Sequence, residues 1–122
     1  MRDYKLYLDD ILLAIKKIEK YTKGLTVKKL KDDDLIIDAV VRNLEIIGEA
    51  VKNIPSHIKE KYPDIEWKKI SGLRDILAHE YFGIDLEILW DIVKNKLPEL
   101  KAEITRLLKW AKIFYAYTLQ IS

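Results

Sequence analysis

The stretch Ile70-Ser-Gly-Leu-Arg-Asp-Ile-Leu-Ala-His-Glu-Tyr-Phe-Gly83 is the part of the chain around which the fold is organised. Apolar residues recur here at spacings of three and four (Ile70, Leu73, Leu77), which predicts a helix with one face toward a core. Within eight residues the same helix carries four chemically active side chains: Arg74, Asp75, His79 and Tyr81. We therefore predict that this segment is the working element and that the rest of the chain is the bundle that presents it.

The composition predicts one globular domain spanning residues 1–122. Of the 122 residues, 49% are hydrophobic and 34% are charged, and the net charge is +2. These values exclude a disordered chain, while a charge of +2 is too small to identify a polyanionic partner by itself. Four glycines and three prolines favour a few long helices over many short strands.

The cysteine content and the apolar runs indicate the cellular compartment. The chain has no cysteine, which rules out a disulfide framework, a thiolate nucleophile and a cysteine metal site. No apolar run approaches the roughly 20 residues that a membrane helix needs. The first residues lead directly into a charged periodic segment without the apolar core of a signal peptide. A cytoplasmic protein without membrane contact is therefore expected.

Hydrophobic periodicity predicts four main helices joined by short connections. They are expected over about residues 3–21, 35–53, 64–83 and 86–108, with one or two further helical turns at 56–62. Pro98 lies inside the last run, and because the apolar stripe resumes in register beyond it, a kink is predicted at this proline. The predicted fold is an all-α antiparallel bundle of four to five helices with a kinked long last helix.

Three features of these helices carry further expectations. Gly48 costs about 1 kcal/mol relative to alanine inside a helix, so close approach of another backbone is the expected compensation. The acidic triplet 32–34 is interpreted as a helix cap rather than a metal site, because no glycine-containing calcium-loop spacing follows it. The aromatic tail from Trp110 to Tyr117 either extends the last helix or packs on a partner.

The four active side chains cannot all meet at one point on a straight helix. At about 100° per residue, Asp75 and His79 lie on one face, so the carboxylate can orient the imidazole. Arg74 lies about 140° around the helix from His79, and Tyr81 about 200° from it. A second copy of the helix across a two-fold axis would bring arginine and histidine together more easily. This geometry predicts a homodimer with its site at the interface.

The pairing of an arginine with a histidine suits chemistry at an RNA phosphodiester. A histidine can accept a proton near neutral pH, and an arginine stays charged and grips phosphate oxygens with two donors. The imidazole would help the 2′-hydroxyl attack phosphorus while the guanidinium stabilises the developing charge. Spacing alone leaves a structural alternative open, namely a buried His79–Asp75 pair and an Arg74 salt bridge at a helix seam.

Several other polar residues are open to two interpretations. Arg42 and Glu49 could line the cleft, or they could form ion pairs within or between helices. His57 is interpreted as a solvated surface histidine because it stands among charged neighbours. Four tyrosines are expected in the core or at its rim rather than as stacking platforms for bases: Tyr4, Tyr7, Tyr21 and Tyr62.

The segment Arg74-Asp-Ile-Leu-Ala-His79-Glu-Tyr81 matches the pattern R-x-x-x-x-H-x-Y. This pattern resembles the signature of the HEPN superfamily in its HepT-like toxin branch. The stretches Tyr7-Leu-Asp-Asp-Ile-Leu and Arg42-Asn-Leu-Glu-Ile-Ile-Gly-Glu-Ala50, together with Trp67 and Leu97-Pro98, are also similar to that branch. The resemblance covers nearly the whole chain.

This resemblance implies a HEPN-like helical homodimer whose two motifs face a shared cleft. It implies a ribonuclease that needs no metal and no cofactor, acts on RNA such as tRNA, and is the toxin of a toxin–antitoxin pair. Arg74 and His79 would be catalytic, with Asp75 in support. The implied antitoxin is a minimal nucleotidyltransferase resembling MntA, which would attach AMP to Tyr81 and so exclude RNA phosphate by bulk and charge. A second function remains open, that of a non-catalytic helical module bound to the nucleotidyltransferase.

Overall fold

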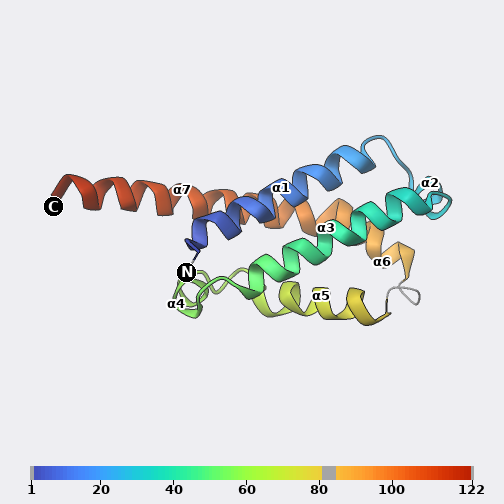
Figure 1. Cartoon of the computed structure of the whole chain (residues 1–122). Coiled ribbons are helices and arrows are strands. Elements are labelled where there is room, and N and C mark those ends of the chain that lie inside the picture. The colour runs from blue at the N-terminus through green and yellow to red at the C-terminus, as the bar shows by residue number, and fades with distance from the viewer. Residues whose placement is uncertain (1, 81–84, 122) are drawn as a thin grey trace.

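Figure 1 shows the computed structural model, which is an all-α antiparallel bundle in the residues that the structure describes. These residues are 2–80 and 85–121, without the side chains of residues 76, 78–80 and 121. Helix α1 (Tyr4–Thr22) lies antiparallel to α3 (Asp34–Lys52), and α5 (Trp67–Glu80) packs against α3. The long last helix α7 (Leu97–Ile121) returns along α1. The predicted fold class is confirmed.

The side chains of Asp3, Thr26 and Asp33 cap the N-termini of the first three helices. The carboxylate of Asp3 accepts a hydrogen bond from the amide of Lys5, and that of Asp33 accepts one from the amide of Ile36 at the start of α3. The acidic triplet therefore caps a helix, as predicted. The short helix α2 (Val27–Lys31) was not predicted, because five residues are too few to show a hydrophobic period.

The helix that carries the motif begins later than predicted. We expected it to start at Pro63 and Asp64, but after the short helix α4 (Ser56–Lys61) the chain makes a further turn and α5 begins at Trp67. The indole nitrogen of Trp67 donates to the carbonyl of Tyr62 at 3.0 Å, and Ile65 is buried inside this turn. Burial of Ile65 and this hydrogen bond favour a turn over an extra helical turn at this point.

The fourth predicted helix is divided into three parts around Pro98. Helix α6 (Leu86–Asp91), capped by Asp85, leads into the π-helical turn η2 (Ile92–Lys96) and then into α7. In the π turn the amide of Leu97 donates to the carbonyl of Ile92, five residues earlier. Proline has no amide hydrogen and crowds the carbonyl four residues before it, so the wider turn accommodates Pro98. Figure 1 shows α6 and α7 at an angle to each other.

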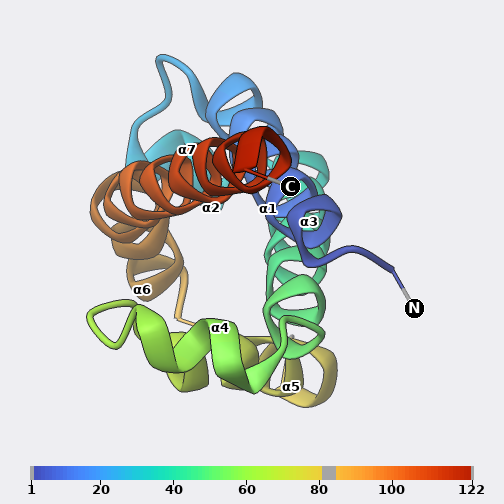
Figure 2. The ribbon, with the colours of Figure 1, turned by 90° about the vertical axis from the view of Figure 1, so that its left-hand side faces the viewer.

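The hydrophobic core lies where α1, α3, α5 and α7 meet. Figure 2 shows α1 and α3 as one wall of the molecule, with α7 and α5 at its two ends. Nine large side chains with at most 1% of their surface exposed belong to these helices: Leu8, Ile11, Ile15, Ile18, Leu44, Ile47, Leu77, Ile104 and Leu107. The aromatic tail extends α7, which was the first of the two predicted alternatives. No helix among the described residues has the length and apolar character needed to cross a membrane.

Candidate functional site

Gly48 on α3 sets the position of α5. A Cβ atom at Gly48 would lie 2.5 Å from the Cβ of Arg74, 3.1 Å from the amide nitrogen of Arg74 and 3.2 Å from the carbonyl oxygen of Ile70. This confirms the expectation that another backbone approaches the glycine closely. Because the contact is made at Arg74 itself, the absent side chain of Gly48 decides how deeply α5 sits and where the guanidinium of Arg74 is placed.

The guanidinium of Arg74 joins α3 to α5 and remains open to solvent. Its Nε lies 3.2 Å from the carboxylate of Glu49, and its NH1 lies 3.2 Å from that of Asp75. The Asp75 carboxylate is also 4.0 Å from the ammonium of Lys52. With the Arg74 side chain 40% exposed, such pairs contribute roughly 0–1 kcal/mol each. Arg74 can therefore exchange these carboxylates for an arriving phosphate at small cost.

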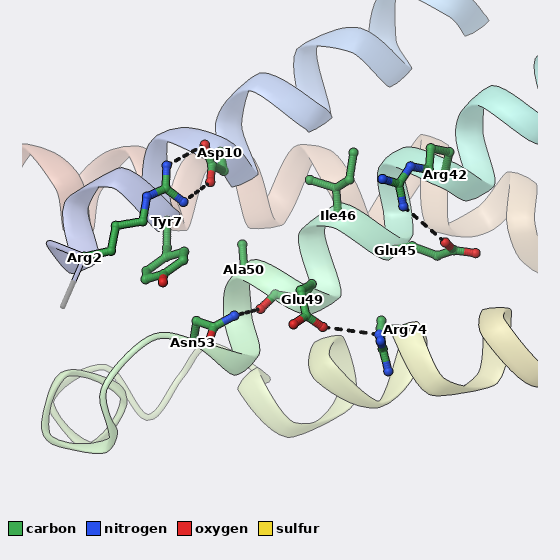
Figure 3. Close-up of a pocket in the computed structure, with 10 residues that line it drawn as sticks. All are labelled: Arg2, Tyr7, Asp10, Arg42, Glu45, Ile46, Glu49, Ala50, Asn53 and Arg74. Carbon is green, nitrogen blue, oxygen red and sulfur yellow. Dashed lines mark hydrogen bonds and ion pairs between the residues drawn. The ribbon is translucent and has the colours of Figure 1, made fainter.

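Arg74 lines a cavity of about 310 Å³ between α1, α3 and α5 (Figure 3). The cavity holds three arginines, each paired with a carboxylate. The shortest separations are 2.6 Å for Arg2–Asp10, 3.7 Å for Arg42–Glu45 and 3.2 Å for Arg74–Glu49. Its ten lining residues are Arg2, Tyr7, Asp10, Arg42, Glu45, Ile46, Glu49, Ala50, Asn53 and Arg74. The pocket therefore presents several guanidinium groups, the donors that phosphate oxygens accept from best.

Two further polar groups line the pocket: the ring of Tyr7 on α1 and the side-chain amide of Asn53 at the end of α3. The guanidinium of Arg2 stands 4.7 Å from the centre of the Tyr7 ring, and its hydrogen bond with Asp10 raises the pKa of Arg2 above the ordinary value. The side-chain amide of Asn53 donates to the carbonyl of Glu49 at 2.8 Å. An aromatic face for a base beside arginines for phosphates is a combination suited to single-stranded nucleic acid.

The structure brings together some of the predicted residues and adds others. Arg42 and Glu49 each form an ion pair, as the second interpretation expected, and each also lines the pocket of this chain. Their place in a cleft shared by two subunits stays a prediction. Tyr7 lies at the rim, as expected for it, and His57 is exposed as predicted. Arg2 and Asp10 were not singled out as site residues. Arg2 precedes the first residue of α1, and Asp10 lies about two turns further along the chain. No sequence motif indicates that these two residues form a pair.

Two of the predicted site residues lie wholly or partly outside the described part of the chain. The backbone of His79 belongs to α5, but its side chain is not described, and Tyr81 lies outside the described residues altogether. The meeting of Arg74 with His79 therefore stays a prediction. In the described part of the chain, no group of three or more histidines, cysteines or carboxylates is placed to hold a metal ion.

The structure is thus an all-α bundle whose pocket holds three arginines, each paired with a carboxylate. Residues 11–107 match the family described as "Ribonuclease HepT-like". The chain belongs to this HepT-like ribonuclease family, in agreement with the resemblance noted in the sequence. The family match ends at residue 107, so the last turns of α7 lie beyond it.

Several curated proteins are similar over most of this chain. "Probable ribonuclease HepT" of Thermococcus cleftensis is 44% identical over 108 residues, which cover 88% of this chain and 98% of that protein. "Putative RNase MJ1216" of Methanocaldococcus jannaschii is 44% identical, with 88% and 89% covered. "Gamma-glutamylcyclotransferase and putative RNase MJ0434" of the same organism is 45% identical, and the matched part is 49% of its length. The chain thus spans about half of that last relative. No solved structure matches this chain significantly.

Proposed function

We propose that the chain is a metal-independent ribonuclease, that residues 1–122 form one domain carrying this activity, and that it is the toxin of a toxin–antitoxin pair. The observation that carries the proposal is the placement of Arg74 in a chain of the HepT-like ribonuclease family. The guanidinium stands at the wall of an open pocket, held by carboxylates that it can release. Arg74 does form the salt bridge between helices that the structural alternative expected, but its side chain is 40% exposed and that of Asp75 is 54% exposed, so neither group is sealed in the seam.

The proposed reaction uses a hydroxyl group of the RNA itself as the nucleophile. His79 takes the proton from the 2′-hydroxyl, whose oxygen forms a bond to the adjacent phosphorus as the bond from phosphorus to the 5′-oxygen breaks. The leaving oxygen takes a proton, which leaves a 2′,3′-cyclic phosphate and a 5′-hydroxyl end. Arg74 binds the non-bridging oxygens, where charge accumulates in the transition state. Asp75, one residue from Arg74, holds the guanidinium from the α5 side.

The rest of the pocket supports binding of the nucleotides beside the cleaved bond. The side chain of Arg42 is 72% exposed, and its separation of 3.7 Å from the carboxylate of Glu45 is long for an ion pair. Arg42 is therefore available to a second phosphate. The sequence favoured a rim position over a stacking role for Tyr7, but its ring lies in the same cavity, so we propose that it also stacks on a base. Single-stranded segments of RNA, such as the loops of tRNA, present phosphates and unpaired bases in this way.

The proposed active unit is a homodimer in which two motifs share one cleft. Arg74 faces α3 through the contact with Gly48, and His79 follows it by about 140° on the same helix. A second copy related by a two-fold axis supplies arginine and histidine from opposite sides. The shared cleft then contains two sites, each made of Arg74 from one chain and His79 from the other. A mixture of Arg74→Ala and His79→Ala chains should therefore regain part of the activity, because one site of each mixed dimer keeps both residues.

The proposed regulation is modification of Tyr81 by a minimal nucleotidyltransferase resembling MntA. Adenylate attached to this tyrosine would add bulk and negative charge two residues from His79, where RNA phosphate has to bind. Co-expression with the partner, followed by mass spectrometry, should find one or more adenylates on the peptide that contains Tyr81. The Tyr81→Phe variant should remain unmodified, and adenylate elsewhere on the chain would contradict the assignment.

The activity is tested with purified, unmodified protein and RNA in the presence of EDTA. The parent should cleave, while Arg74→Ala and His79→Ala should each lose roughly a hundredfold or more in rate. Arg106→Ala removes an exposed arginine of α7 away from the pocket and should cleave like the parent. Inertness of all four proteins would contradict the nuclease and support the alternative, a non-catalytic module that binds the nucleotidyltransferase. Loss of parent activity in EDTA, restored by a divalent metal, would contradict metal independence.

A further inference from the structure

The last turns of α7 project beyond the bundle and present an uncharged surface to solvent. Figure 1 shows this part of α7 extending past the beginning of α1. Every residue from 112 to 120 is exposed, and no charged residue follows Lys112. An exposed helix without charges is unusual, because a surface helix normally carries polar side chains toward water. This segment also lies outside the part of the chain that matches the ribonuclease family.

Four large side chains form a continuous strip on one side of this segment, which we call the aromatic stripe: Trp110, Ile113, Phe114 and Tyr117. Their spacings of three and four place them on one face of the helix. They are 62%, 47%, 71% and 59% exposed, in chain order. Aromatic residues gathered on an exposed face are typical of the centre of a protein interface.

The contact between α7 and α1 does not cover this stripe. The ring of Tyr115 lies 5.5 Å from the ammonium of Lys5, so this side of α7 faces the first turn of α1. Tyr115 is about 140° around the helix from Trp110. The aromatic stripe therefore faces away from the first turn of α1, and the described part of the chain leaves it open to solvent.

We propose that the aromatic stripe binds the same stripe of a second copy of the chain, with the two α7 helices antiparallel. A fully exposed large side chain offers about 200 Å², so the four residues can remove about 500 Å² from each copy and about 1,000 Å² in all. This reaches the lower bound of about 1,000 Å² for a specific interface.

The charges beside the stripe select the antiparallel arrangement. Lys109 lies beside it, and a parallel pair of helices would place this lysine beside the same lysine of the other copy. An antiparallel pair centred between Ile113 and Phe114 places each lysine opposite the uncharged end of the other helix, and Trp110 opposite Tyr117. The opposed helix dipoles also favour this direction.

This interface is distinct from the shared cleft of the proposed ribonuclease dimer and does not depend on the nuclease activity. It uses neither Arg74 nor any residue that lines the pocket. If both interfaces form, the assembly contains at least four chains, and if only the stripe pairs, it contains two. Disruption of the stripe should therefore lower the molar mass to that of a dimer if both interfaces form, which is half or less, and to that of a single chain if only the stripe pairs, while the pocket and the core remain unchanged.

The first test is light scattering of the purified full chain after gel filtration. The variant Trp110→Glu/Phe114→Glu should have half the molar mass of the parent or less, and the same helical circular dichroism. Leu35→Glu is the matched control, because Leu35 is 80% exposed on α3 and should leave the mass unchanged. Equal masses of the parent and the double variant would overturn the proposal. Binding of a monomeric parent, but not of the variant, to vesicles containing phosphatidylserine would assign the stripe to a lipid surface instead.

The second test uses the absence of native cysteine to determine the direction of pairing. Trp110→Cys and Tyr117→Cys chains, mixed and oxidised, should form disulfide-linked dimers. Each variant alone should form few, because a disulfide needs Cα atoms within about 7 Å. Efficient cross-linking of each variant with itself would overturn the antiparallel arrangement, and cross-linking in none of the samples would overturn the interface.

Discussion

Replacement of Gly48 by alanine tests whether the crossing of α3 and α5 positions Arg74. In an ordinary helix this change stabilises by roughly 1 kcal/mol, because glycine is the more flexible residue in the unfolded chain. Here the new Cβ would lie 2.5 Å from the Cβ of Arg74, which sits too near its backbone to swing aside. Forcing an extra carbon into such a contact costs about 1–3 kcal/mol. Because the contact is very short, we expect the upper end and a net loss of about 2 kcal/mol.

The assay for this prediction is urea and thermal unfolding, with Gly72→Ala as the matched control. Gly72 also lies in a helix, but a Cβ there would meet nothing within 4 Å, so this variant should gain up to about 1 kcal/mol. For a chain of this length, the loss in Gly48→Ala corresponds to a melting temperature lower by roughly 8 °C. RNA cleavage should fall as well, because α5 has to move and carries Arg74 with it. If Gly48→Ala is as stable as Gly72→Ala, the close crossing is wrong.

Three further predictions concern carboxylates. Glu49→Gln should free Arg74 for phosphate, so that RNA carrying 2′-methoxy groups binds several-fold more tightly and with a steeper salt dependence in fluorescence anisotropy, and weaker binding would refute the role of the pair. Asp33→Ala should lower the free energy of unfolding by about 1 kcal/mol through loss of the α3 cap, whereas Asp32→Ala should lower it less. Burial raises the pKa of Glu103 above its ordinary value of 4.5, and repulsion from nearby carboxylates, chiefly Glu99, raises it further. The folded state therefore holds this proton more tightly, and the resulting stability is present below pH 4.5 and is lost as the pH rises through the folded pKa. Glu103→Gln should thus be more stable than the parent at pH 7, with the difference shrinking in acid, and urea unfolding at several pH values measures it.

Features with a local cause could be predicted from the residues in order. The apolar period of α1 and α3, the cap at Asp33 and the disturbance near Pro98 all depend on neighbours within a few residues along the chain. The start of α5 could not be predicted in this way. It depends on burial of Ile65 and on the hydrogen bond from the Trp67 indole, and helical propensity does not report either of them.

The candidate site likewise contains features that the sequence predicted and contacts that it could not predict. The motif indicated Arg74 as a candidate, and helical phase placed it about 140° around the helix from His79. Its partner Glu49 stands on another helix, and its neighbours in the pocket include Arg2 from the start of the chain. Helical phase shows which side of a helix a residue occupies, but it does not show which helix lies opposite.

By itself, the sequence determined the helical class of the protein, its membership of a ribonuclease family and the segment that carries the motif. Only the tertiary structure decided that α5 crosses α3 at Gly48, that three arginines of different segments line one pocket, and that the described residues leave the aromatic stripe of α7 exposed. The physical reason is range. Periods, caps and motifs arise from interactions along one helix, whereas a pocket and an uncovered face depend on how closely separate helices pack.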